Sequence, residues 1–215
     1  MQMPFTSEQF FQVMRQYNES VWPGQLVLYA IGVITTAVAI RMPARSKLVF
    51  ATIALLWAWM AIAYHLAYFT TINPMAYLFG AMFLVQGALI TWYAFRSRLQ
   101  LSYDVGSARR GVGWALVAYA LLAYPVLGYM LGQRYPTIPT FGLPCPTTIF
   151  TLGILVWCAR PVPWTLFVVP ALWSLIATSA AMTFGVGEDY ALVPAFALAV
   201  GVFAWKPRMP AYRTA

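Results

Sequence analysis

The side chains most able to do chemistry in this sequence are few and lie among apolar residues. His65 is the single histidine of the chain, and Tyr64 and Tyr68 are close to it in sequence. An imidazole in such a place is able to bind a substrate, to open a gate on protonation or to ligate an ion. The alternative is a neutral imidazole, hydrogen-bonded to a tyrosine or a backbone carbonyl, with only a structural role.

A second candidate is the proline-rich segment 134–148, which reads RYPTIPTFGLPCPTT and leads into an apolar run. Proline is tolerated at the first turn of a helix, so the sequence predicts that a helix begins close to Cys145. The partial positive charge of that helix start, the hydroxyls of Thr147 and Thr148 and the nearby Arg134 predict a recess that attracts anions. A rigid corner without a ligand is the alternative.

Two of these residues also raise the question of a metal site. Cys145 and His65, with nearby methionines, have the chemistry to hold a soft ion such as Cu(I), whereas a structural zinc takes four ligands. Because the chain has one His and two Cys and no C-x-x-C pair, we expect no metal and no other cofactor. It also lacks nucleophile-elbow, zinc-protease and phosphate-loop motifs, so the sequence does not favour an enzyme.

Two further polar positions complete the candidate site. Gln86 lies near the middle of an apolar run, where a lone amide ties helices together by about 0.6–2 kcal/mol or lines a pore. Glu188 and Asp189 stand at the start of the last apolar run, where the helix dipole favours acids and a cation would be attracted second. The predicted substrate-binding set is therefore His65, Tyr68, Gln86, Arg134, Cys145, Thr147, Thr148 and Glu188.

The elements that position these side chains are predicted to lie in lipid. Of the 215 residues, 62% are hydrophobic and 8% are charged, whereas a soluble domain has about 25% charged residues. A soluble core of this size could not hide so much apolar surface from water. Since backbone in lipid must satisfy its own hydrogen bonds, the predicted fold class is all-α, a polytopic transmembrane helix bundle.

Apolar runs near the length needed to cross a bilayer, about 20 residues, recur seven times. They cover residues 21–40, 48–70, 75–95, 111–132, 142–159, 162–182 and 189–205, of which the fifth and seventh are the shortest. A gapless alignment of the third run with the seventh pairs aromatic residues such as Tyr77 and Tyr190. This pairing suggests a three-one-three internal repeat, with the fourth run as an inverting connector.

Charge divides the connecting segments into two sets. The net charge is +8, and one set holds 11 of the 13 basic residues, namely Arg41, Arg45, Lys47, Arg96, Arg98, Arg109, Arg110, Arg160, Lys206, Arg208 and Arg213. The other set holds Arg15 and Arg134 together with four of the five acids. The positive-inside rule therefore predicts seven spans with the N-terminus outside and the C-terminus inside. Because the basic residues are scattered between apolar runs, nucleic acid is not an expected partner.

The residues before the first run are expected to form a helix of their own. Thr6 and Gln9 have the spacing of a capping box, and aromatic residues such as Phe10 follow. We predict an extracytoplasmic interfacial helix over residues 1–20, with a lid packed on the bundle as the alternative. Residues 21–205 then form the seven-helix bundle and residues 206–215 a basic cytoplasmic tail.

Several segments carry a resemblance to a known family. They read EQFF at 8–11, YNESVWP at 17–23, YH at 64–65, INPMAYLFG at 72–80 and TFGLPCPTTIFT at 140–151. Together they resemble a bacterial multi-pass inner-membrane protein family of unknown function, over nearly the whole chain. The resemblance implies a multi-pass protein of the bacterial inner (plasma) membrane, and it carries no activity or functional residue with it.

The predicted function is a small transporter or channel for a small solute or ion, with a polar site open to the outside. Its basis is the expected convergence of polar residues from several runs beside a proline-broken helix start. A non-catalytic accessory subunit of a membrane complex and a membrane metal or redox protein are the alternatives. The expected partners are the lipid bilayer and either further copies of the chain or another membrane complex.

Overall fold

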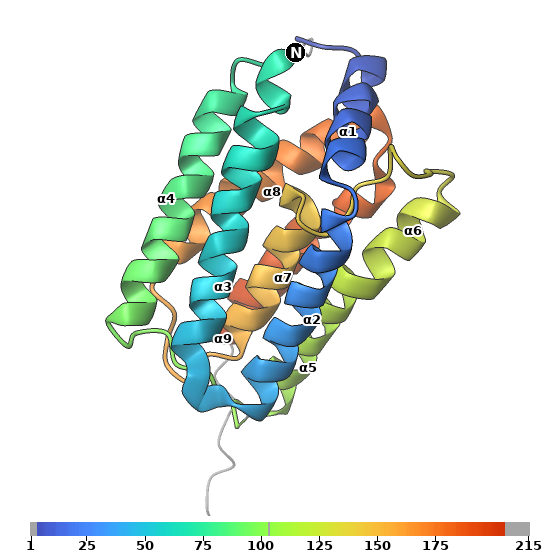
Figure 1. Ribbon diagram of the computed structural model, residues 1–215. Coiled ribbons are helices and arrows are strands. Elements are labelled where there is room, and N and C mark those ends of the chain that lie inside the picture. Colours follow the sequence, from blue (N-terminus) through green and yellow to red (C-terminus); the bar gives the residue numbers. More distant parts are fainter. Residues whose placement is uncertain (1–3, 103, 205–215) are drawn as a thin grey trace, which may run out of the picture.

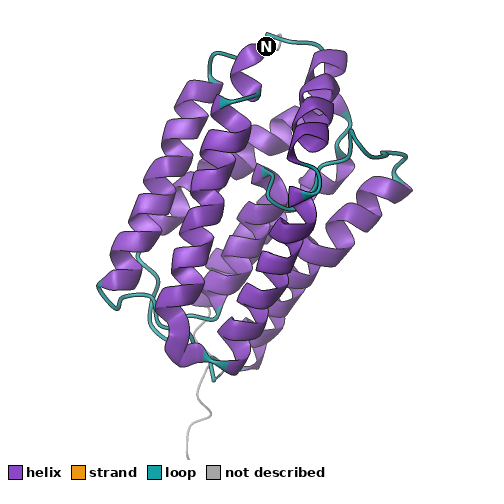
Figure 2. Ribbon diagram, in the orientation of Figure 1, coloured by secondary structure: helices purple, strands orange, loops and turns teal. Residues whose placement is uncertain are grey.

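The protein is an all-α bundle in the computed structural model, which describes residues 4–102 and 104–204 (Figure 1). The all-α part of the prediction is confirmed, since these residues form helices and loops with only two isolated β-bridges (Figure 2). The helices are α1 (Ser7–Val21), α2 (Gly24–Arg41), α3 (Ser46–Trp59), α4 (Ala76–Phe95), α5 (Ser107–Ala118), α6 (Tyr124–Met130), α7 (Pro144–Val156), α8 (Thr165–Phe184) and α9 (Leu192–Ala204). The predicted tail, residues 206–215, lies outside the described residues.

Five stretches within the described residues are long and apolar enough to cross a membrane. They are Gly24–Arg41, Pro43–Thr71, Ala76–Phe95, Ser107–Met130 and Thr165–Phe184. Helices α7 and α9 occupy the fifth and seventh predicted runs, but each has 13 described residues. At 1.5 Å per residue that is about 20 Å, less than the roughly 30 Å of a hydrocarbon core.

Helix α7 lies in the middle of the bundle (Figure 1). Every residue from Pro146 to Val156 is buried, which suits a helix that is apolar all round. Glycines allow its close packing on α5, since a Cβ added to Gly153 would lie 3.1 Å from the backbone oxygen of Gly113. The loop before α7 is fixed by Asn18, whose Nδ2 donates to the carbonyl oxygens of Pro136 (2.6 Å) and Ile138 (2.9 Å).

Two of these five stretches contain π-helical turns. Helix α3 continues into the π-helical segment Met60–Leu66, and α5 continues through the π-helical segment Tyr119–Ala123 into α6. Such turns shift the side chains that follow and are frequent at functional sites. The first carries Tyr64 and His65. The second carries Tyr119, whose hydroxyl donates to the carbonyl oxygen of Glu188 at 2.7 Å.

Basic residues gather at one end of the bundle. Eight of the ten that the structure describes lie at the adjoining ends of α2 to α5 and α7 (Figure 1), namely Arg41, Arg45, Lys47, Arg96, Arg98, Arg109, Arg110 and Arg160. The loops there are tied together, since the backbone N–H of Leu101 donates to Ser46 Oγ at 2.8 Å and that of Ala159 to the carbonyl oxygen of Gln100 at 2.6 Å. The described part of the chain is therefore electrically asymmetric along the bundle axis.

Helix α1 covers the opposite end of the bundle. Its capping box is formed, with Gln9 Oε1 accepting from the Thr6 backbone N–H at 2.8 Å and Thr6 Oγ1 accepting from that of Gln9 at 3.2 Å. Its apolar side is buried against the bundle through Phe10, Met14 and Tyr17. Helix α1 is therefore packed on the bundle along its apolar side.

Candidate functional site

A cavity of about 240 Å³ lies beneath α1. Its roof is aromatic, because Phe5 and Phe10 stack on Phe184 of α8 with ring centroids 5.3 and 4.8 Å apart. Its walls come from the first π-helical segment, the start of α4, the start of α7 and α8. The cavity is thus lined by segments that are far apart in sequence.

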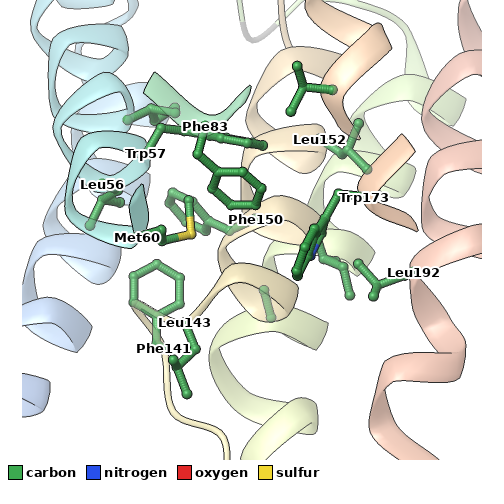
Figure 3. Close-up of a cluster of buried hydrophobic side chains, with 14 of the residues drawn as sticks. Leu56, Trp57, Met60, Phe83, Phe141, Leu143, Phe150, Leu152, Trp173 and Leu192 are labelled. Carbon is green, nitrogen blue, oxygen red and sulfur yellow. The ribbon is translucent and has the colours of Figure 1, made fainter. Parts of the chain in front are cut away.

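The lining of the cavity is mostly apolar. Seven aromatic side chains contribute to it: Phe5, Phe10, Tyr64, Phe69, Phe79, Tyr124 and Trp173. Trp173 packs edge-on against Phe79 with ring centroids 5.7 Å apart. Figure 3 shows the same Trp173 within the buried cluster that also holds Leu143, Phe150 and Leu192. The cavity therefore adjoins the hydrophobic core at the end of the bundle that α1 covers.

One carboxylate lies in this apolar wall. Asp189 lines the cavity from the 3₁₀ segment Gly187–Ala191 and is 5% exposed. The hydroxyl of Tyr124 donates to Asp189 Oδ1, and the thiol of Cys145 is hydrogen-bonded to the same carboxylate. The sequence prediction started the last run at Asp189, but α9 begins at Leu192, so the acid belongs to the turn before the helix.

Burial dominates the electrostatics of this turn. It raises the pKa of Asp189, which the hydrogen bonds from Tyr124 and Cys145 only partly oppose. It also raises the pKa of Glu188, whose Oε2 accepts from Gln133 Nε2 at 3.3 Å. No Lys or Arg of the described residues lines the cavity. The ionised form of Asp189 therefore has no cationic partner in the cavity wall.

His65 lies behind the cavity wall and does not line it. The imidazole is fully buried among the rings of Tyr64, Phe69, Phe79, Phe83 and Trp173, at centroid distances of 4.7–6.1 Å. Neither ring nitrogen has a hydrogen-bond partner among residues 4–102 and 104–204. The tyrosine or carbonyl partner considered for a structural histidine is not seen in that part of the chain.

Several predicted site residues have structural partners. The hydroxyl of Tyr68 donates to Ser20 Oγ at 2.6 Å, on the α1 side of the bundle. Gln86 Nε2 donates to the carbonyl oxygen of Leu166 at 2.9 Å, which is the helix-tying role of a lone amide. Neither side chain lines the cavity.

The start of α7 does not form the predicted anion recess. Thr147 Oγ1 accepts from the Gly142 backbone N–H at 3.1 Å, and Thr148 Oγ1 is buried without a partner in the described chain. The Arg134 guanidinium lies 3.8 Å from the centre of the Tyr129 ring and donates to nearby backbone oxygens. A carboxylate, not a basic group, faces this helix start.

Of the eight predicted site residues, only Cys145 lines the cavity. Glu188 lies next to the cavity residue Asp189, which the sequence suggested mainly as a helix cap. Tyr124 and Trp173 had no distinguishing signal, since aromatic residues make up 17% of the chain. The signal for Asp189 was its position, as an acid that follows Gly185 and Gly187 and precedes an apolar run.

The described residues contain no group of three or more His, Cys, Asp or Glu side chains placed to hold a metal ion. Within the described residues, Cys145 and Asp189 form a pair without a third such ligand.

Comparison with known proteins gives one match. A model for a family of unknown function (DUF6064) matches residues 7–213. No curated protein and no solved structure matches the chain.

Proposed function

Since the chain belongs to DUF6064, a family of unknown function, we propose its activity from the cavity itself: a small integral membrane transporter with an outward-facing binding site. The observation that carries the proposal is the cavity of about 240 Å³ under α1. Small-molecule sites are concave, mostly apolar and fitted with a few polar groups. The cavity under α1 has this composition, with Asp189 and Cys145 among its few polar groups.

The proposal is supported by the position of α7. Transporters commonly place their sites where a helix starts or breaks inside the bundle. Helix α7 starts at Pro144, in the cavity wall, and its 13 residues are too few to cross the hydrocarbon alone. The preceding irregular segment lies against protein, where such backbone is tolerated in a membrane.

We further propose seven crossings in a bacterial inner membrane, with α1 outside, and α7 and α9 as the fifth and seventh. The clustering of eight described basic residues at the end opposite α1 supports this orientation. In a three-one-three repeat, the stretch Ser107–Met130 would be the inverting connector.

Accessibility of the Cys145 thiol tests transport. In a Cys158→Ser protein, where Cys145 is the sole cysteine, a membrane-impermeant thiol reagent is applied to spheroplasts and to inverted membrane vesicles. A transporter that alternates access is labelled from both sides. Labelling from one side only would contradict transport, and labelling from neither would favour an accessory subunit.

A matched pair of variants on α8 assigns the labelling to the cavity. Ala177 is buried and lines the cavity, whereas Ala171 is half-buried and does not. We expect Ala177→Leu to slow the reaction of Cys145 and Ala171→Leu to leave it unchanged. Equal effects of the two variants would show that the reagent reaches the thiol by another route.

A further inference from the structure

Resting on the proposed function, we infer that the cavity binds a small organic cation, a protonated amine on an apolar body about the size of one ring, with Asp189 as its counter-ion. The inference names the substrate class of the site described above. It depends on the charge, the lining and the size of the cavity.

The charge of the wall selects a cation. Asp189 is 5% exposed, and Glu188, the neighbouring acid, is 1% exposed. A buried carboxylate requires a proton, a cation or several hydrogen-bond donors. Tyr124 and Cys145 supply two donors, and no basic side chain of the described residues lines the cavity. A bound ammonium group would complete the pairing.

The same wall disfavours an anion. The start of α7 would ordinarily present free N–H groups, but proline at positions 144 and 146 removes two of them. Arg134 is the basic residue nearest in sequence to the start of α7. Its guanidinium lies over the Tyr129 ring and does not line the cavity. An anionic ligand would meet Asp189 without a compensating charge.

The apolar lining and the volume define the rest of the ligand. Rings such as those of Tyr64 and Trp173 attract an ammonium group through their faces and pack on hydrocarbon. A cavity of about 150 Å³ holds one benzene, so the cavity of about 240 Å³ has room for a ring with a short aminoalkyl arm. Met75 is 51% exposed and Ser179 is exposed, so the lining reaches the surface between α4 and α8. An amphiphile has a path to the cavity there.

Three matched probes test the ligand class. Phenethylamine, 2-phenylethanol and phenylacetate have similar bodies and differ in charge at pH 7. The readout is protection of Cys145 from a neutral thiol reagent in the Cys158→Ser protein, reconstituted in nanodiscs. We expect phenethylamine to protect at concentrations about 10- to 100-fold lower than 2-phenylethanol. Phenylacetate is expected to protect least.

Two variants assign the preference to one carboxylate. Asp189→Asn should remove the preference for the amine over the alcohol, while protection by 2-phenylethanol shows that the cavity is intact. Glu19→Gln removes an exposed acid of α1 and should leave the preference unchanged.

The outcomes separate the two proposals. Equal protection by amine and alcohol, or an amine preference that survives Asp189→Asn, would overturn the organic-cation inference and leave the cavity as a binding site. A Cys145 that reacts from neither membrane side would overturn the proposed function itself.

Discussion

The close approach of α7 and α5 allows a sharp test of how α7 is held in the bundle. A Cβ on Gly153 of α7 would lie 2.9 Å from Val117 Cγ2 and 3.1 Å from the backbone oxygen of Gly113. Because a backbone oxygen cannot rotate away, Gly153→Ala must push the two helices apart. Gly111, also helical, has no atom within 4 Å of the same position.

The two alanine variants isolate the packing cost. Each variant gains about 0.5–1 kcal/mol of stability because alanine is a better helix former than glycine. Overpacking costs about 1–3 kcal/mol, and only Gly153→Ala incurs it. We therefore expect Gly111→Ala to raise the free energy of unfolding by about 0.5–1 kcal/mol. The free energy of unfolding of Gly153→Ala should be about 1–3 kcal/mol lower than that of Gly111→Ala.

Unfolding by sodium dodecyl sulfate in mixed micelles, followed by tryptophan fluorescence, measures the difference. Since α7 carries Cys145 into the cavity wall, Gly153→Ala should also change the rate at which the thiol is labelled. A Gly153→Ala protein at least as stable as Gly111→Ala would refute the tight packing of α5 on α7.

Three further predictions concern buried polar groups. Trp57→Phe removes the hydrogen bond from Trp57 Nε1 to Thr151 Oγ1 (3.0 Å). It should lower the free energy of unfolding by about 1–2 kcal/mol. Trp164→Phe is the control, because Trp164 is 74% exposed. A loss no larger than that of the control would contradict a structural role for this bond. In thermal unfolding, His65→Phe should leave the stability of the protein unchanged or raise it, because neither imidazole nitrogen has a hydrogen-bond partner in the described chain. A loss of stability above about 2 kcal/mol would mean that the imidazole makes a polar interaction. Burial raises the pKa of Asp189 above its value in the unfolded chain, so its ionisation opposes folding as pH rises. The stability advantage of Asp189→Asn should therefore grow between about pH 4 and pH 8, and an advantage that is constant or shrinks would refute the assignment.

The fold class followed from composition, and the long helices followed from run length. Runs such as 75–95 and 162–182 match α4 and α8 closely because each contains enough apolar residues to cross a bilayer. Helix α7 has the same hydropathy, yet it is short and central. Apolar residues face lipid and protein equally well, so hydropathy does not distinguish a crossing from a buried core helix.

The candidate site was less predictable because depth in a membrane does not determine direction. The sequence predicts that His65 lies within an apolar run, but it does not determine whether the imidazole packs behind Trp173 or faces the cavity. The position of Asp189 before an apolar run predicts helix capping, since an acid before a helix ordinarily has that role. Its contact with Tyr124 joins residues 65 positions apart, and no local pattern reports such a pairing.

The hydrogen bonds of Asn18 connect α1 to the segment before α7. This side chain belongs to α1, and its Nδ2 donates to the carbonyl oxygens of Pro136 and Ile138, which precede α7. Gln25 of α2 in turn donates to the Asn18 carbonyl oxygen at 2.6 Å. Lifting α1 must therefore either break these bonds or drag that segment along, so a displacement of α1 reaches the start of α7 at Pro144 and Cys145.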